Sequence, residues 1–140
     1  MPAGGVRVLV DTGPLVALFD PSDRARAGCE RTLARLRGQT LVSSLAVITE
    51  ATYLLAFSPR AQRGLLAFIA AGAVEIAPFG PQDVSRAAAL MARYESLPMD
   101  FADATLVVLA ERLGTQSIFT LDRRDFAVYR VGRRAFRLLS

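Results

Sequence analysis

Short apolar segments alternate along the chain with longer segments of helical periodicity. Apolar and β-branched residues fill Val6–Val10, Leu41–Ser43, Val74–Ala77 and Ser117–Thr120, with a last short run at Phe126–Tyr129. Runs of this length predict buried strands. Strands that alternate with helices predict a mainly parallel sheet covered on both faces, which is the α/β class.

Capping residues, prolines and glycines mark the expected helices. Pro14 is tolerated in the first turn of a short helix from Thr12 to Phe19. Ser22 is a candidate N-cap for an arginine-rich helix that ends near Gly38, and Ser43 or Ser44 for a helix over 45–57. Further helices are expected at 59–71, ended by Gly72, at 81–94, and at 100–113, ended by Gly114.

Length and composition predict one globular domain over residues 1–140, since 52% of the residues are apolar and 21% are charged. Glu50 interrupts the most apolar early segment, so no run reaches the roughly 18 apolar residues of a membrane span. Residues 1–10 lack the layout of a signal peptide. We therefore expect a soluble, cytoplasmic protein without a membrane partner.

The residue types present exclude several kinds of chemistry. Histidine is absent, which removes Ser-His and Cys-His catalysis and imidazole metal sites. Cys29 is the single cysteine, so an internal disulfide and a cysteine-based metal site are excluded. All 17 basic residues are arginine, and the net charge is +4. Guanidinium groups suit phosphate, although biased codon composition explains an all-arginine set equally well.

Acidic residues occur where an α/β fold places its ligand site, beyond the carboxyl ends of the strands. Asp11 directly follows the first predicted strand and Asp122 comes two residues after the last residue of the fourth. Either one is also compatible with a turn or a helix cap. Glu50 lies within a largely apolar helix, where a buried carboxylate needs an arginine or a cation as partner, unless it lies at an exposed edge.

Asp100 and Asp103 stand three residues apart at the start of a predicted helix. The first is a candidate N-cap and the second a first-turn acid favoured by the helix dipole. The same spacing puts both on one helical face, from which one or both could reach a metal.

Considered together, the acids predict an oxygen-rich metal site, with Asp11, Glu50, Asp103 and Asp122 as the catalytic carboxylates. Mg²⁺ and Mn²⁺ prefer such ligands. A site of this kind binds phosphate and activates water, which predicts phosphodiester hydrolysis. The carboxylates repel one another until a cation enters.

Four segments, in this order and spacing, resemble the PIN domain, and specifically the VapC-type toxin ribonucleases. They are Val8–Leu15, Val47–Glu50, Asp103–Ala110 and Phe119–Phe126, the last with its Asp-Phe pair. The resemblance covers nearly the whole chain. It implies a three-layer α/β/α sandwich, cleavage of RNA with Mg²⁺ or Mn²⁺, a homodimer, and a cognate antitoxin that blocks the site.

Carried over by position, the resemblance implies that Asp11 and Asp103 bind the metal directly. It implies that Glu50 and Asp122 complete the acidic pocket, and that Thr120 orients Asp122 or a water. Two departures stand out. Gly13 occupies a place where many relatives have a small hydroxyl residue, and Asp100 is an additional acid whose role, as ligand or cap, stays open.

Two surface features have less specific interpretations. Arg123 and Arg124 flank Asp122 and are candidates for binding RNA phosphates, while the C-terminal arginines fit a solvated or antitoxin-facing surface at least as well. The apolar segment Leu65–Ile69 is a candidate dimer face, with ordinary core as the favoured assignment.

Three other classes of function stay open. A phosphatase with Asp11 as nucleophile is disfavoured, because Gly13 stands where that group typically has a second Asp and the chain has no lysine. A non-catalytic binding module is disfavoured because all four acids are present. A PIN nuclease that cuts DNA, or that processes RNA outside any toxin system, is the third.

Overall fold

A computed structural model of the chain describes residues 6–140. The expectation about a signal peptide falls partly on residues 1–5, which lie outside the described residues. A five-stranded sheet forms the centre, and all four of its strand pairings are parallel. The strands, in the order β3-β2-β1-β4-β7, are β3 (Glu75–Ile76), β2 (Thr40–Ser43), β1 (Arg7–Val10), β4 (Ser117–Phe119) and β7 (Arg137–Leu139). The predicted parallel sheet is confirmed.

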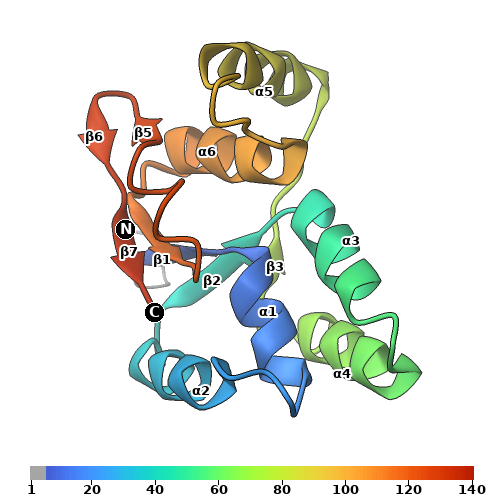
Figure 1. Ribbon diagram of the computed structural model, residues 1–140. Coiled ribbons are helices and arrows are strands. Elements are labelled where there is room, and N and C mark those ends of the chain that lie inside the picture. Colours follow the sequence, from blue (N-terminus) through green and yellow to red (C-terminus); the bar gives the residue numbers. More distant parts are fainter. Residues whose placement is uncertain (1–5) are drawn as a thin grey trace.

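Helices cover both faces of this sheet. They are α1 (Thr12–Phe19), α2 (Arg26–Arg35), α3 (Leu45–Leu54), α4 (Pro59–Ala70), α5 (Pro81–Arg93) and α6 (Phe101–Leu113). Figure 1 shows α5 and α6 above the sheet, α1, α2 and α4 below it, and α3 beside its edge. The chain therefore has the predicted α/β/α layers. None of the helices in residues 6–140 is long and apolar enough to cross a membrane.

Helix α6 is the most deeply buried helix of the fold. Its residues 104–110 are all buried, including the apolar run Leu106–Ala110, because α6 packs against α5, α3 and β1. Asp100 caps its first turn, and Gly114 ends it in the left-handed conformation, with φ of 66°. The acids at its N-terminus are therefore attached to a rigid element.

Strands β1 and β4 are neighbours, and their carboxyl ends meet. Asp11 N donates to Phe119 O over 2.9 Å, which extends the pairing to the first residue beyond β1. The chain runs outward from β1 to β2 and β3 on one side, and through β4 to β7 on the other. The boundary between β1 and β4 is thus the switch point at which α/β folds bind ligands.

The strand predicted at Phe126–Tyr129 is wrong. These residues form turns, closed by hydrogen bonds from Val128 N and Tyr129 N to Asp125 O. Phe126 and Tyr129 both point into the core instead of alternating between two faces. The fifth strand of the sheet is β7, which follows a separate hairpin of β5 (Arg130–Val131) and β6 (Arg134–Ala135).

The Ser22 cap is also wrong. Both the backbone N–H and the hydroxyl of Ser22 donate to Asp20 Oδ1, which makes a turn, and α2 begins only at Arg26 without a side-chain cap. Of the two alternatives for α3, Ser44 is the cap and accepts from Val47 N.

The segment Leu65–Ile69 of α4, a candidate dimer face, is largely core, which was the assignment favoured from the sequence. Leu65 and Ile69 are buried, and Phe68 packs edge-on against Phe19 at a ring distance of 5.4 Å. Within the segment, Leu66 is the exposed large side chain.

Candidate active site

Asp11 is held at the end of β1 by two hydrogen bonds. Thr12 N donates to Oδ1 over 2.8 Å and Thr120 Oγ1 donates to Oδ2 over 2.8 Å. Its side chain is only 6% exposed. Asp11 is also the N-cap of α1, so the capping interpretation and a functional one both apply to this residue.

Glu50 extends from α3 toward the same point. The hydroxyl of Thr12 donates to Glu50 Oε1 over 2.6 Å. The partner that this half-buried carboxylate was expected to need is therefore a threonine hydroxyl, and within residues 6–140 no arginine pairs with it.

Asp100 and Asp103 take different positions at the start of α6. Asp100 Oδ1 accepts from Asp103 N over 2.8 Å, so Asp100 is the N-cap that was one of its two expected roles. The carboxylate of Asp103 accepts a hydrogen bond from Tyr129 Oη at 2.9 Å.

The turn after β4 brings a further pair of acids. Asp122 N donates to Thr120 Oγ1 over 2.9 Å, and Asp125 N donates to Asp122 Oδ1 over 3.0 Å. Carboxylate oxygens of Asp103, Asp122 and Asp125 lie within 4.8 Å of one another. Asp125 was missed by the sequence reasoning, although it belongs to the Asp-Phe pair that contributed to the resemblance.

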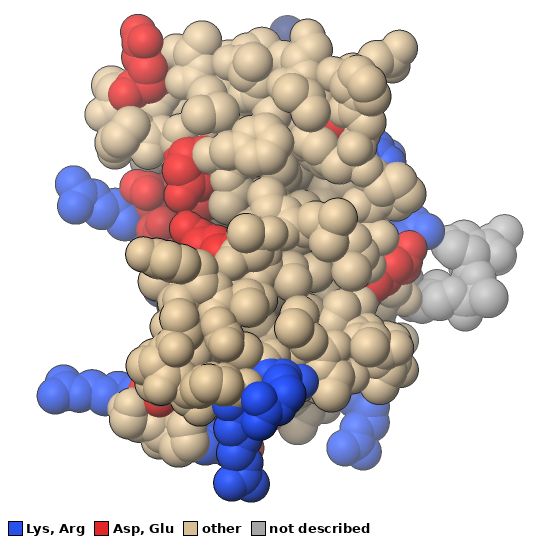
Figure 2. Space-filling model, turned by 90° about the vertical axis from the view of Figure 1, so that its right-hand side faces the viewer, with Lys and Arg blue, Asp and Glu red and all other residues tan. Residues whose placement is uncertain are grey.

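These acids line one cleft of about 380 Å³, here called the acidic cleft. Its acidic lining residues are Asp11, Asp23, Glu50, Asp100, Asp103, Asp122 and Asp125, and no arginine lines it. Figure 2 shows acidic side chains gathered in a hollow toward the left of that face. All four carboxylates proposed from the sequence therefore converge.

The cleft raises the pKa of two of its acids. Burial raises the pKa of Asp11 from 3.8 to about 6, against the lowering effect of the bonds from Thr120 and Thr12. Burial, followed by the charges of Asp100 and Asp11, raises the pKa of Asp103 to about 8. Near neutral pH Asp103 therefore retains a proton that a cation would displace, whereas Asp11 is mostly ionised.

The donor set fits a divalent cation. It consists of carboxylate oxygens, which Mg²⁺ and Mn²⁺ prefer, without nitrogen or sulfur ligands. The three ion pairs of the described residues all involve acids outside the cluster, so within residues 6–140 its carboxylates have no cationic partner. Burial and Asp103 raise the pKa of Tyr129 above its usual range, so that this phenol stays a proton donor.

Arg123 and Arg124 lie outside the acidic cleft. Arg123 Nη1 donates to Ser140 Oγ over 3.0 Å and so extends toward the C-terminus. Arg124 is exposed and its charge acts on Asp125. Burial and the charge of Asp122 raise the pKa of Asp125, and Arg124 offsets part of that rise.

Leu121 takes up the space beside Gly13. A Cβ at Gly13 would lie 3.3 Å from Leu121 Cβ, which is a tight contact. The acidic cleft therefore has an apolar wall at Gly13, the position where the resemblance led us to note a missing hydroxyl.

Comparison with known proteins identifies the family of the chain. The family model described as PIN domain matches residues 8–132. Ribonuclease VapC26 of Mycobacterium tuberculosis (strain ATCC 25618 / H37Rv) is 34% identical over 125 residues, which are 88% of this chain and 92% of that protein. The chain belongs to the PIN domain family.

Solved structures have the same fold. The crystal structure of Mycobacterium tuberculosis VapC20, a sarcin-ricin loop cleaving toxin, superposes with a TM-score of 0.76 at 21% identity, covering 84% of this chain and 91% of that one. A toxin-antitoxin complex from Klebsiella pneumoniae gives a TM-score of 0.64 at 22% identity, covering 86% of this chain and 91% of that one.

Proposed function

We propose that residues 1–140 form one domain that is a metal-dependent endoribonuclease, the toxin of a type II toxin–antitoxin pair acting in the cytoplasm. The observation that carries this proposal is the convergence of Asp11, Glu50, Asp103 and Asp122 at the β1–β4 switch point, where none of the described residues provides a cationic partner. RNA as substrate is supported by the relative named Ribonuclease VapC26.

In this proposal Asp11 and Asp103 ligate Mg²⁺ or Mn²⁺, and Glu50 and Asp122 complete the site. A cation held there supplies positive charge for the scissile phosphate and lowers the pKa of nearby water. Asp125 adds a carboxylate beside Asp122. Without a cation, the ionised acids that line the cleft repel the phosphates of RNA.

The remaining parts of the chain fix these acids and bind the substrate. The hydroxyls of Thr12 and Thr120 hold Glu50 and Asp11 at fixed orientations. Arg124, and Arg123 once released from Ser140, bind backbone phosphates of the RNA beside the cleft.

Cleavage of single-stranded RNA tests the activity. We expect cleavage with Mg²⁺ or Mn²⁺, loss of cleavage with EDTA, and loss in Asp103→Asn. Glu111→Gln is the matched control, because Glu111 lies on the same helix but pairs with Arg86 outside the cleft. Full activity in thoroughly chelated buffer would remove the metal mechanism.

The cleavage assay, combined with RNA binding and with growth after expression, separates the alternatives. A non-catalytic module would bind RNA without cutting it in any metal. A PIN nuclease outside a toxin system would cut RNA or DNA, but its expression would not arrest growth.

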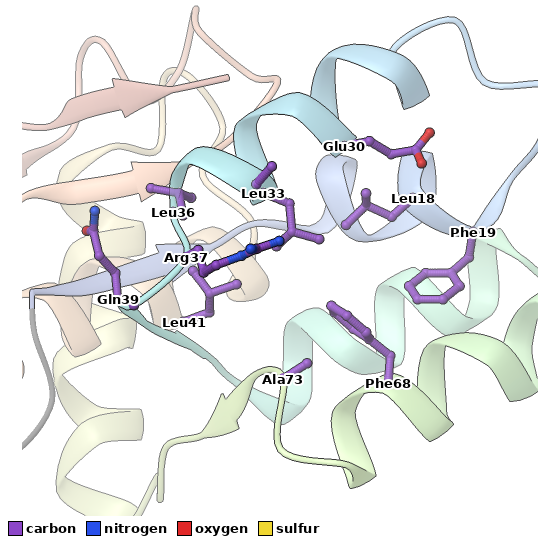
Figure 3. A pocket seen from close by; sticks show the side chains of 12 residues that line it. Leu18, Phe19, Glu30, Leu33, Leu36, Arg37, Gln39, Leu41, Phe68 and Ala73 are labelled. Atoms are coloured by element: carbon purple, nitrogen blue, oxygen red, sulfur yellow. The ribbon is translucent and has the colours of Figure 1, made fainter.

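An antitoxin partner is supported by a second hollow, the apolar groove, of about 660 Å³. Its walls include Leu18 and Phe19 of α1, Leu33 after the middle of α2, Leu41 of β2 and Phe68 of α4 (Figure 3). The groove is larger than the acidic cleft but carries no cluster of reactive groups, so it fits apolar side chains of a protein partner.

Helix α1 connects the two hollows. It begins beside the acids at Thr12 and ends in the groove at Phe19, roughly 10 Å away at 1.5 Å per residue. A partner seated in the groove therefore needs only a few extended residues to cover the acidic cleft.

A substitution on the rim of the apolar groove tests whether the antitoxin binds there. Ala34 is exposed and lines the groove, so Ala34→Arg should block it without removing a core side chain. Ala88→Arg, at an exposed position of α5 in the opposite layer, is the control. We expect the small protein encoded beside this one to copurify with the control and not with Ala34→Arg; copurification with both would place it elsewhere.

A homodimer is supported by an exposed apolar row on α3 and the turn after it. Leu45 and Tyr53 of α3 and Phe57 of the following turn are 63%, 76% and 64% exposed. Figure 2 shows the side of the molecule on which α3 lies, and most of it is uncharged. A second copy of the chain is the occupant we propose for this row, called the α3 row.

A further inference from the structure

Tyr129 is a core residue whose hydroxyl contacts Asp103, one of the acids that line the acidic cleft. Its side chain is fully buried, at 0% exposure, and its hydroxyl donates to Asp103 Oδ2 over 2.9 Å. A buried phenol needs a hydrogen-bond partner. Here that partner is a carboxylate of the proposed metal site and not a backbone carbonyl or a solvent-facing group.

The ring of Tyr129 is fixed by two other aromatic rings. Tyr94 and Phe126 lie edge-on to it, with ring centroids at 5.1 and 5.0 Å. Phe126 in turn packs against Phe136 at 5.4 Å. Because the ring is buried and packed against two other rings, its hydroxyl is held at one point beside Asp103 of α6.

The backbone of this segment is fixed as well. Tyr129 N donates to Asp125 O, and the next residue, Arg130, donates its N–H to Tyr94 Oη over 3.1 Å. The turn that carries Asp122 and Asp125 into the cleft is thereby joined to the aromatic cluster that holds Tyr129.

The hydrogen bond from Tyr129 engages only one of the two carboxylate oxygens of Asp103. Oδ2 is engaged by Tyr129, whereas no hydrogen bond within residues 6–140 engages Oδ1. A carboxylate whose one oxygen is fixed to a rigid donor presents the other in a fixed direction. Partners of this kind orient metal ligands, and their loss typically lowers metal affinity by about 10- to 100-fold.

We infer that Tyr129 is a positioning residue, whose hydroxyl holds the Asp103 carboxylate in the orientation that binds the divalent cation. The inference rests on the proposed metal site. It assigns a role in metal binding to a residue that otherwise belongs to the core, and it explains why a tyrosine occupies a position packed on two sides by aromatic rings.

Thermal melts of the full chain during a Mn²⁺ titration test this role. We expect Tyr129→Phe to raise by about tenfold the Mn²⁺ concentration that gives half of the maximal rise in Tm. Tyr94→Phe is the matched control. It removes a hydroxyl from the same aromatic cluster, but that hydroxyl contacts the backbone of Arg130 and no carboxylate. Both variants should lower the Tm without metal, and only Tyr129→Phe should shift the metal midpoint.

The outcomes separate this inference from the proposed function. A wild-type protein whose Tm does not respond to Mn²⁺ overturns the metal site and this inference with it. A wild type that responds and a Tyr129→Phe variant with the same midpoint overturn the inference alone. RNA cleavage should follow the same pattern, with the loss in Tyr129→Phe recovered at high Mn²⁺.

A second comparison applies if Tyr129→Phe does not fold. We then compare Asp103→Asn with the double variant Asp103→Asn/Tyr129→Phe. In both proteins the Asp103 carboxylate, which Tyr129→Phe alone would leave without its hydrogen-bond donor, is replaced by a neutral amide. Since Tyr129 acts only through the Asp103 carboxylate, adding Tyr129→Phe to Asp103→Asn should not lower any further the Mn²⁺-induced rise in Tm. A further weakening in the double variant would contradict the inference.

Discussion

The buried hydroxyl of Thr120 donates a hydrogen bond to Asp11 Oδ2 over 2.8 Å, and so links the end of β4 to the end of β1. The hydroxyl oxygen of Thr120 also accepts a hydrogen bond from Asp122 N over 2.9 Å. One threonine thus fixes the side chain of one proposed ligand and the backbone of another. Thr120 is 0% exposed, so water cannot replace either contact.

Thr120→Val tests what this link does. Valine keeps the shape but leaves the Asp11 oxygen and the Asp122 N–H without a partner, which should cost about 1–3 kcal/mol of unfolding free energy. RNA cleavage and the Mn²⁺-induced rise in Tm should both weaken. Urea unfolding and cleavage assays measure the two effects.

Thr115 is a matched control at the other end of β4. Its hydroxyl donates to the backbone carbonyl of Arg7 over 2.7 Å and accepts from Ser117 N over 3.2 Å, so it also makes one donated and one accepted bond, but to backbone groups away from the cleft. Thr115→Val should lose similar stability and keep its response to metal. Equal loss of cleavage in the two variants would mean that stability alone controls activity.

The two acids at the start of α6 should respond differently to substitution. Asp103→Asn removes a proposed ligand and should abolish cleavage in a folded protein. Asp100→Asn keeps a good N-cap and should keep much of the activity, whereas Asp100→Ala should lose about 0.5–2 kcal/mol of stability. If Asp100→Asn is as inactive as Asp103→Asn, then Asp100 is a ligand as well as a cap.

The placement of the site could be predicted because it follows from topology. Asp11 and Thr120 each come directly after a strand, and parallel neighbouring strands bring their carboxyl ends together whatever the surrounding sequence. Helix ends at Gly72 and Gly114 were equally predictable, because both glycines have positive φ, of 95° and 66°.

The partners of the acids could not be predicted, because they come from tertiary packing. Nothing local pairs Glu50 with Thr12, which is 38 positions away, or Asp103 with Tyr129, which is 26 positions away. The apolar run at Phe126–Tyr129 has the composition of a strand, but the turn at Asp125 bends it so that both rings enter the core. Short apolar runs do not distinguish these two conformations.

The α3 row predicts the oligomeric state. Tyr53→Arg places a charge in the middle of the proposed interface and should convert a dimer to a monomer in light scattering after size exclusion. Because Tyr53 is 76% exposed, the fold itself should be unaffected. Val128→Arg is the control, since Val128 is an exposed apolar residue, 45% exposed, in the turn before β5. A dimer that survives Tyr53→Arg would remove α3 as the interface.

Stability without metal should fall as the pH rises from about 4 to 8. The pKa of Asp11 rises from 3.8 to about 6 on folding and that of Asp103 to about 8, so the folded chain holds protons that the unfolded chain has released. Their stabilising contribution is complete below the unfolded pKa and is lost as the pH passes the folded values. The Tm without metal should therefore decline across this range, and Mn²⁺, which replaces these protons, should raise the Tm more at pH 8 than at pH 5.

The Asp11→Asn/Asp103→Asn variant should show neither effect, because it removes both shifted groups and relieves the repulsion among the acids. Without metal at pH 8 it should melt above wild type. For wild type, a cation at a hundredfold excess over its dissociation constant contributes about 2.7 kcal/mol, or roughly 5–10 °C in Tm for a chain of this size; the double variant should gain little.

Asp83→Asn/Glu111→Gln is the control, since it neutralises two acids that pair with arginines outside the cleft, and it should retain the wild-type pH profile and metal response. A double variant that gains as much from Mn²⁺ as wild type does would place the ion elsewhere on the protein.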